Sequence, residues 1–133
     1  MSNKTFKYSD ETGHIIGLAM KVHRTLGNGF QERIYQRALE IEFSKNLIPF
    51  KREFVMPVLY DGEEIGLRRV DFLVYENISV EIKAQVKLEA VHFAQAINYL
   101  EAYNLEIGLL INFGSTSLQF KRLLNGKIAE RDK

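Results

Sequence analysis

The chain has 133 residues, of which 46% are hydrophobic and 26% charged, and its formal net charge is +1 at pH 7. This length suits a single domain over residues 1–133 with short polar tails, and no apolar run approaches the ~20 residues that span a bilayer. We therefore expect a cytoplasmic protein without membrane contact. The absence of cysteine excludes disulfides, thiolate metal sites and cysteine nucleophiles. The near-neutral charge slightly weakens a nucleic-acid-binding hypothesis, because many such proteins are strongly basic.

Two helices are predicted in the first third of the chain. Asp10 to Thr12 favours a helix start, and apolar residues then recur at helical spacing as far as Leu26, where Gly27–Gly29 ends the helix. A second helix is predicted over 31–45. Its inward face is expected to hold six residues: Ile34, Tyr35, Ala38, Leu39, Ile41 and Phe43.

Three strands are predicted next. Residues 50–60 have a β-like composition, the dipeptide at 61–62 is the hairpin signal Asp-Gly, and the returning strand covers 65–75. A short turn at 76–77 leads into a third strand over 78–84.

A helix over 88–103 and two further strands are predicted to complete the chain. The strand over 107–113 is so apolar that burial on both faces is expected, a last strand covers 118–124, and the polar tail 127–133 is expected to fray. The inward face of the helix is expected to hold Val91, Ala94, Ile97 (or Asn98) and Leu100. The order α-α-β-β-β-α-β-β predicts an α/β protein with a mixed β-sheet flanked by helices, because only the helical crossover joins parallel strands.

Charged side chains stand in two neighbouring predicted strands where the surroundings are apolar. Asp71 lies in the segment RVDFLV (69–74), and Glu81 and Lys83 lie in SVEIKA (79–84). Because side chains alternate across a strand, Glu81 and Lys83 share a face, and pairing through the turn at 76–77 brings Asp71 opposite about residue 81 to 83. A buried charge is costly unless it is paired or binds a metal, so these residues are the main clue to function.

The three side chains suit metal-assisted phosphodiester cleavage. Mg²⁺ (or Mn²⁺) prefers hard oxygen ligands such as the carboxylates of Asp71 and Glu81 and the carbonyl of Ile82. Lys83 is placed to orient the attacking water or to neutralise developing charge. The tripeptide alone is uninformative, since 17 acids and ten lysines in 133 residues predict roughly one Glu/Asp-x-Lys by chance. A Glu–Lys pair on a solvated strand face remains the alternative.

Several motifs, in order between about Gly13 and Arg122, resemble those of the PD-(D/E)XK nuclease superfamily, whose core has the order α-β-β-β-α-β. More narrowly, the chain resembles the small bacterial proteins labelled GxxExxxxxR. The matching segments are VHRTLGNGFQERIY (22–35), RVDF (69–72), VEIKA (80–84), QAINYL (95–100) and GLLINFG (108–114). Val70 stands where the motif has proline, and the arginine of the narrower label would fall at Ala38.

The resemblance implies a restriction-endonuclease-like core and a magnesium-dependent nuclease that hydrolyses DNA. By position, it makes Asp71 and Glu81 metal ligands and Lys83 the catalytic lysine. It also makes Glu32 a helix glutamate that assists the metal through water, and Gln95 a residue that supports the site or contacts substrate. A twofold homodimer is expected where both strands of a duplex are cut.

Structural roles compete with functional ones at other polar residues. The helix dipole favours Glu32 at a helix start, Tyr99 is expected to be partly buried beside the sheet, and His23 to cap or pack near a helix end. The three histidines lack zinc-site spacing. Three basic pairs either line a phosphate path or are solvated surface: Lys51-Arg52, Arg68-Arg69 and Lys121-Arg122.

Three functions are therefore considered. The first is a metal-dependent nuclease acting on DNA. The second is a non-catalytic module on the same fold that binds nucleic acid or a protein partner. The third is a structural oligomer, which predicts an ion network of Asp71, Glu81 and Lys83 with no open cavity.

Overall fold

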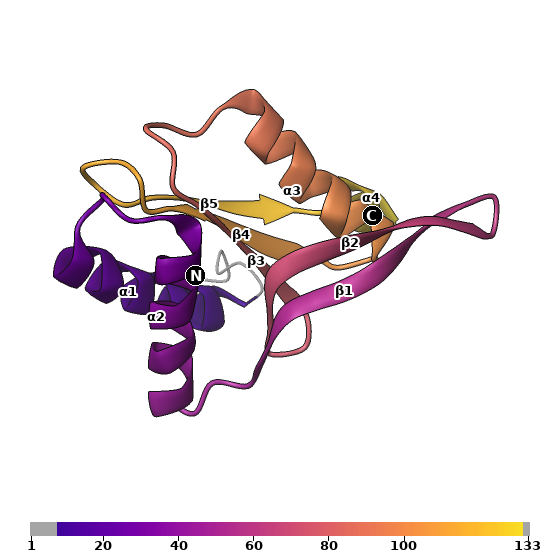
Figure 1. Cartoon of the computed structure of the whole chain (residues 1–133). Helices are drawn as coiled ribbons and strands as arrows, with labels where there is room; N and C mark the ends of the chain where they lie inside the picture. Colours follow the sequence, from indigo (N-terminus) through magenta and orange to yellow (C-terminus); the bar gives the residue numbers. More distant parts are fainter. Residues whose placement is uncertain (1–7, 132–133) are drawn as a thin grey trace.

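Five strands form one mixed sheet in the computed structural model, which describes residues 8–131 (Figure 1). The strands are β1 (Phe50–Tyr60), β2 (Glu63–Val74), β3 (Ile78–Lys83), β4 (Ile107–Asn112) and β5 (Gln119–Leu124). They follow chain order across the sheet, with β3 and β4 parallel and all other neighbours antiparallel. This arrangement confirms the predicted α/β class with a mixed sheet.

Helices cover both faces of the sheet. They are α1 (Ser9–Leu26), α2 (Glu32–Lys45), α3 (Ala90–Ala102) and α4 (Gly126–Arg131). The tail that we expected to fray instead forms α4 as far as residue 131, while residues 132–133 lie outside the described part. Among residues 8–131, no helix has the length and apolar character needed to cross a membrane.

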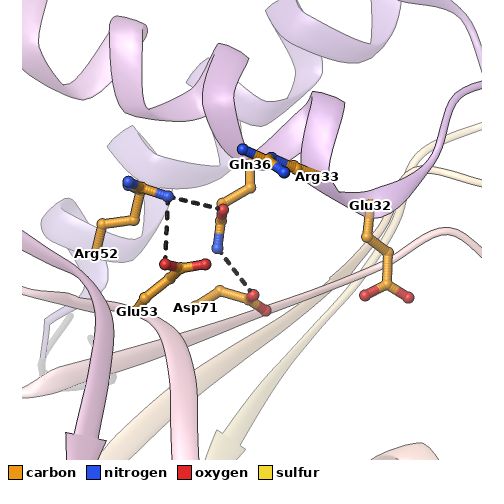
Figure 2. Close-up of a pocket in the computed structure, with 6 residues that line it drawn as sticks. All are labelled: Glu32, Arg33, Gln36, Arg52, Glu53 and Asp71. Carbon is orange, nitrogen blue, oxygen red and sulfur yellow. Dashed lines mark hydrogen bonds and ion pairs between the residues drawn. The ribbon is translucent and has the colours of Figure 1, made fainter.

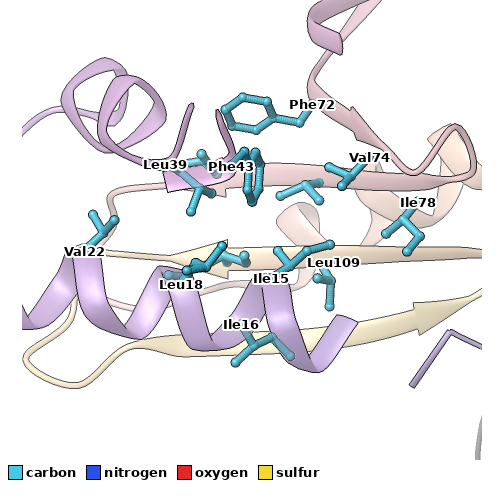
Figure 3. Close-up of a cluster of buried hydrophobic side chains, with 14 of the residues drawn as sticks. Ile15, Ile16, Leu18, Val22, Leu39, Phe43, Phe72, Val74, Ile78 and Leu109 are labelled. Atoms are coloured by element: carbon cyan, nitrogen blue, oxygen red, sulfur yellow. The ribbon is translucent and has the colours of Figure 1, made fainter. Parts of the chain in front are cut away.

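The larger hydrophobic core lies between the sheet and the pair α1 and α2 (Figure 3). From α1 the apolar stripe at helical spacing supplies Ile15, Leu18 and Val22, and the strands supply side chains from β2, β3 and β4. In β4, Leu109 and Ile111 face this core, while Leu110 between them faces α3, as the period of two requires. Residues 107–112 of β4 are all buried, which confirms the prediction of a strand enclosed on both faces.

The buried face of α2 differs from the predicted one. Ile34 and Ile41 are 44% and 59% exposed, so their predicted inward positions are wrong. The buried residues are Tyr35, Gln36, Leu39 and Phe43. They follow the helical period of 3.6 more closely than the predicted set, which spread around too much of the helix.

The buried face of α3 is also rotated from the prediction. Leu100 is buried and Ile97 packs against the core, as predicted. Val91 is 56% exposed and Ala94 is exposed, whereas Ala96 and Tyr99 are buried instead. Ala96 and Leu100 form a second, smaller core with Leu110 of β4 and Leu123 of β5. The side of α3 that packs against β4 and β5 is therefore the buried one, although Val91 and Ala94 also place apolar residues on another side of the helix.

The β1–β2 hairpin extends beyond the rest of the sheet (Figure 1), because β3 pairs only with residues 72–74 of β2. Its turn has positive φ at Asp61 (54°) and Gly62 (82°), as expected for a tight hairpin. Within β1, Glu53 also has a positive φ of 53°, and the register of β1 with β2 omits the pair Glu53–Asp71. The pairs on either side, Arg52–Phe72 and Phe54–Val70, keep the same register, so the irregularity is confined to the position opposite Asp71.

Tyr35 connects the α1–α2 loop to the core and provides a test of this packing. Its ring is fully buried and stacks on Phe113 with centroids 4.6 Å apart, while its hydroxyl donates to the Gly27 carbonyl at 2.6 Å. The hydroxyl also accepts from the Phe30 N–H at 3.1 Å.

Tyr35→Phe is expected to lower the free energy of unfolding by about 1–3 kcal/mol, because two polar groups lose their partner. Urea denaturation measures the change. The control Tyr60→Phe, at a ring 72% exposed, is expected to unfold like the parent chain, and an equal loss in both variants would contradict this explanation.

Candidate functional site

The residues singled out from the sequence line one cleft of about 420 Å³. It lies where β2 and β3 separate, between the start of α2 and the exposed side of α3. The predicted candidates among its lining residues are Glu32, Asp71, Glu81, Ile82, Lys83 and Gln95. Arg68 and Arg69 complete the lining. Glu32 and Gln95 are exposed, so the cleft is accessible from solvent.

Two hydrogen bonds fix the carboxylate of Asp71. One oxygen accepts from the Ile82 N–H at 2.7 Å and the other from the Gln36 side-chain amide at 3.1 Å. The β2–β3 pairing ends at Phe72 and Val80, so the side chain of Asp71 satisfies a backbone donor that the ladder no longer reaches. The carboxylate is therefore held at the mouth of the separating strands.

Gln36 connects Asp71 to a second hollow of about 480 Å³ (Figure 2). Arg52 Nη1 donates to Gln36 Oε1 at 3.3 Å, which turns the amide nitrogen of Gln36 towards Asp71. Glu32 and Asp71 line both hollows, so the Asp71 carboxylate lies between them. Gln36 was not among the residues predicted from the sequence. Its signal was a polar residue within the buried stripe of α2, four positions after Glu32.

Arg68 pairs with Glu81, which is 7% exposed. The guanidinium donates to Glu81 Oε2 at 3.1 Å and to the Gln95 carbonyl at 3.0 Å, and lies over the ring of Tyr99 at 5.3 Å from its centroid. The pair compensates the cost of burying this carboxylate. From the sequence, Arg68 was a candidate only for a phosphate path, because strand alternation predicts that Arg69, not Arg68, shares the face of Asp71.

The acidic groups of the cleft repel one another. The pKa of Asp71 is raised from 3.8 to about 6. Burial is the main cause, and the charges of Glu81 and Glu32 act in the same direction, while the Ile82 hydrogen bond and Lys83 oppose the increase. A cation between the carboxylates would relieve this repulsion. No group of three or more His, Cys, Asp or Glu side chains within residues 8–131 could hold a metal ion. Two carboxylates with a backbone carbonyl and waters nevertheless fit Mg²⁺, which commonly uses only one or two carboxylates.

The raised pKa of Asp71 predicts a pH effect on stability. The folded chain binds this proton more tightly than the unfolded chain. The resulting stabilisation is full below pH 3.8 and is lost as pH rises through about 6. Its size is about 3 kcal/mol at most, at ~1.4 kcal/mol for each pKa unit. Metal-free Asp71→Asn is expected to lack this contribution, so its stability relative to the parent should rise between pH 4 and pH 7. Urea denaturation across that range measures the difference, and parallel profiles for the two chains would contradict it.

Other polar candidates have structural contacts. The His23 ring lies 2.9 Å from the Ser115 carbonyl, which agrees with the predicted packing role, and Tyr99 is fully buried rather than partly so. Arg122 donates to the Thr12 hydroxyl at 3.0 Å, and Lys51 lies over the ring of Phe54. Of the three basic pairs, only Arg68-Arg69 lines the cleft.

A mixed sheet flanked by helices, with two acids and a lysine at its separating strands, defines a nuclease-type α/β fold. The sequence model of the PD-(D/E)XK nuclease superfamily matches residues 9–123, and the chain belongs to this superfamily. The expected restriction-endonuclease-like core is thereby confirmed.

The fold is similar to a solved structure, the crystal structure of SSO0001, with a TM-score of 0.57 and 16% sequence identity. The alignment covers 93% of this chain and 65% of that protein, so the chain spans less than two thirds of its length. At this identity the likeness concerns the fold alone. The comparison with curated proteins found no match.

Proposed function

We propose that the protein is a metal-dependent nuclease that hydrolyses phosphodiester bonds in DNA. The observation that carries the proposal is the meeting of Asp71, Glu81 and Lys83 in a cleft accessible to solvent. Membership of the PD-(D/E)XK nuclease superfamily supports it.

The metal site consists of the carboxylates of Asp71 and Glu81 and the carbonyl of Ile82. These hard oxygens suit Mg²⁺ or Mn²⁺, and Glu32 assists through water from the start of α2. When bound, the ion supplies Lewis-acid stabilisation of the charge that develops on the phosphate and activation of the attacking water. The bonds from Gln36 and Ile82 hold Asp71 in place before any ligand arrives.

Cationic and polar side chains around the acids act on the substrate. Lys83, two residues after Glu81 on β3, orients the attacking water and offsets negative charge at the phosphate. Arg68 and Arg69 line the cleft, and their positive charge attracts the phosphates of the substrate strand. Gln95 supports the site from α3, where its carbonyl already positions Arg68.

Cleavage assays with purified protein test the proposal. Single-stranded, duplex and supercoiled DNA are incubated with Mg²⁺ or Mn²⁺, and parallel reactions contain a chelator. We expect cleavage of at least one DNA form that the chelator abolishes. Intact DNA under all metal conditions would contradict catalysis, and equal cleavage with chelator would contradict the role of the metal.

A non-catalytic module that binds nucleic acid or a protein partner is the second candidate. The ion pair between Arg68 and Glu81 favours it, because it compensates a carboxylate that the nuclease uses for metal. Calorimetric titration with Mg²⁺ and Mn²⁺ separates the two functions. The nuclease predicts a binding heat, and its absence at millimolar metal with DNA present would favour the module. The open cleft argues against the third function, which predicted an ion network without a cavity.

A further inference from the structure

The outer part of β2 presents a strand edge without a neighbour within the described residues. One side of β2 pairs with β1, and the other pairs with β3 only at residues 72–74. All residues from Glu63 to Leu67 are exposed, and the apolar side chains of Ile65 and Leu67 are 65% and 67% exposed. Unpaired edges with exposed apolar residues are sites where another strand can add.

The sequence of this edge is complementary to itself. Residues 63–69 read Glu-Glu-Ile-Gly-Leu-Arg-Arg, with two acids before and two arginines after an apolar centre at Gly66. In an antiparallel pair of two such strands centred on Gly66, Glu63 lies opposite Arg69, Glu64 opposite Arg68, and Ile65 opposite Leu67. Opposite charges and apolar pairs stabilise facing strands.

We propose that two copies of this chain form a twofold dimer by antiparallel pairing of their β2 edges about Gly66. A parallel pair in register would place acids against acids and arginines against arginines, so charge selects the antiparallel arrangement. The pair Glu63–Arg69 contributes most. The guanidinium of Arg68 is already bonded to Glu81 at 3.1 Å. The side chain of Arg69 is 61% exposed, and its ion pair with Glu53 is long, at 3.8 Å, so it is available to a partner strand.

The dimer joins the two hairpins into one four-stranded ribbon. Arg69 lies three residues from Gly66, so the two copies of Arg69 stand about 20 Å apart along the ribbon at ~3.3 Å per residue. Arg69 also lines the candidate cleft, so both clefts adjoin the same ribbon. The dimer would bring two nuclease sites to one duplex only if the proposed function is correct. The strand pairing itself does not depend on that function.

A single engineered cysteine tests the pairing, because the chain has none of its own. A side chain at Gly66 would meet no atom within 4 Å, and residue 66 faces its own copy in the dimer. Facing Cα atoms in antiparallel strands are about 4.5–5.5 Å apart, within the range that a disulfide bridges. Gly66→Cys is therefore expected to form a disulfide-linked dimer under mild oxidation. The control Gly13→Cys, on α1 with equally open space, is expected to stay largely monomeric.

Charge reversal tests the register. Glu63→Arg alone and Arg69→Glu alone each place like charges opposite one another in a homodimer, so both variants are expected to sediment as monomers of about 15 kDa. A mixture of the two variants restores both opposite-charge pairs and is expected to sediment as a heterodimer of twice that mass. Circular dichroism establishes that each variant is folded, and Glu76→Arg, in the β2–β3 turn, is expected to dimerise like the parent.

A parent chain that is monomeric at high concentration, with Gly66→Cys no faster to crosslink than Gly13→Cys, would overturn the proposal. Dimers that persist in both single charge variants would place the interface elsewhere and also overturn it. Because these experiments measure mass and crosslinking rather than cleavage, their failure is distinguishable from failure of the proposed nuclease function.

Discussion

Lys83→Ala is expected to lower the rate of metal-dependent DNA cleavage by about 10²- to 10³-fold, the effect typical of removing one group that stabilises charge in a transition state. Lys83 lines the cleft and acts on the Asp71 carboxylate electrostatically, so it stands beside the proposed reaction centre. The variant keeps Asp71, Glu81 and Ile82, and Mg²⁺ binding is therefore expected to persist. Single-turnover cleavage at saturating metal separates this chemical effect from a loss of binding.

Lys87→Ala is the matched control for that experiment. Lys87 is an exposed lysine four residues further along and does not line the cleft. Its removal lowers the net charge equally but is expected to leave cleavage almost unchanged. Undiminished cleavage by Lys83→Ala would remove the proposed mechanism, and equal losses in both variants would indicate that Lys83 acts only through general attraction of DNA.

Glu81→Gln is expected to weaken Mg²⁺ binding more than about 100-fold, beyond the effect typical of residues that only support metal ligands. The substitution keeps the size of the side chain but removes one of two proposed carboxylate ligands. It leaves Arg68 beside a neutral amide, which adds net positive charge to the cleft and opposes a cation further. Isothermal titration calorimetry with Mg²⁺ measures the loss.

Mg²⁺ binding by Glu32→Gln is compared with binding by Glu81→Gln, because the two acids are proposed to act on the metal in different ways. Because Glu32 is proposed to act on the metal through water, its substitution is expected to weaken Mg²⁺ binding by about 10- to 100-fold. Equal affinities of Glu81→Gln and the parent would exclude Glu81 as a ligand. A greater loss in Glu32→Gln than in Glu81→Gln would contradict the assignment of direct and water-mediated roles. Urea denaturation of each variant shows whether the fold is retained.

Local patterns predicted most elements of this fold, because helical periodicity, turn residues and apolar strands act over a few positions. The short turn before β3 also predicted the strand register closely. The observed pairs Phe72–Val80 and Val74–Ile78 extrapolate to Asp71 opposite Glu81. The faces of α2 and α3 were predicted less well, since apolar residues on both helices exceed what the sheet can cover. Ile41 and Val91 are consequently exposed.

The residues that surround the candidate site could not be predicted from local patterns, because they contact one another across long stretches of the chain. Gln36 meets Asp71 across 35 positions, and Arg68 meets Gln95 across 27. The spacing of apolar and polar residues along the chain does not predict these contacts.

Local pattern and motifs in fixed order were enough to predict the superfamily, the strands that carry Asp71, Glu81 and Lys83, and the order of helices and strands apart from α4. How the two acids are held became visible only in the folded chain. Burial raises the pKa of Asp71, Gln36 and the Ile82 N–H orient its carboxylate, and Arg68 pairs with Glu81. The physical reason is that desolvation and side-chain hydrogen bonds depend on which distant segments pack together, and this is settled only when the chain has folded.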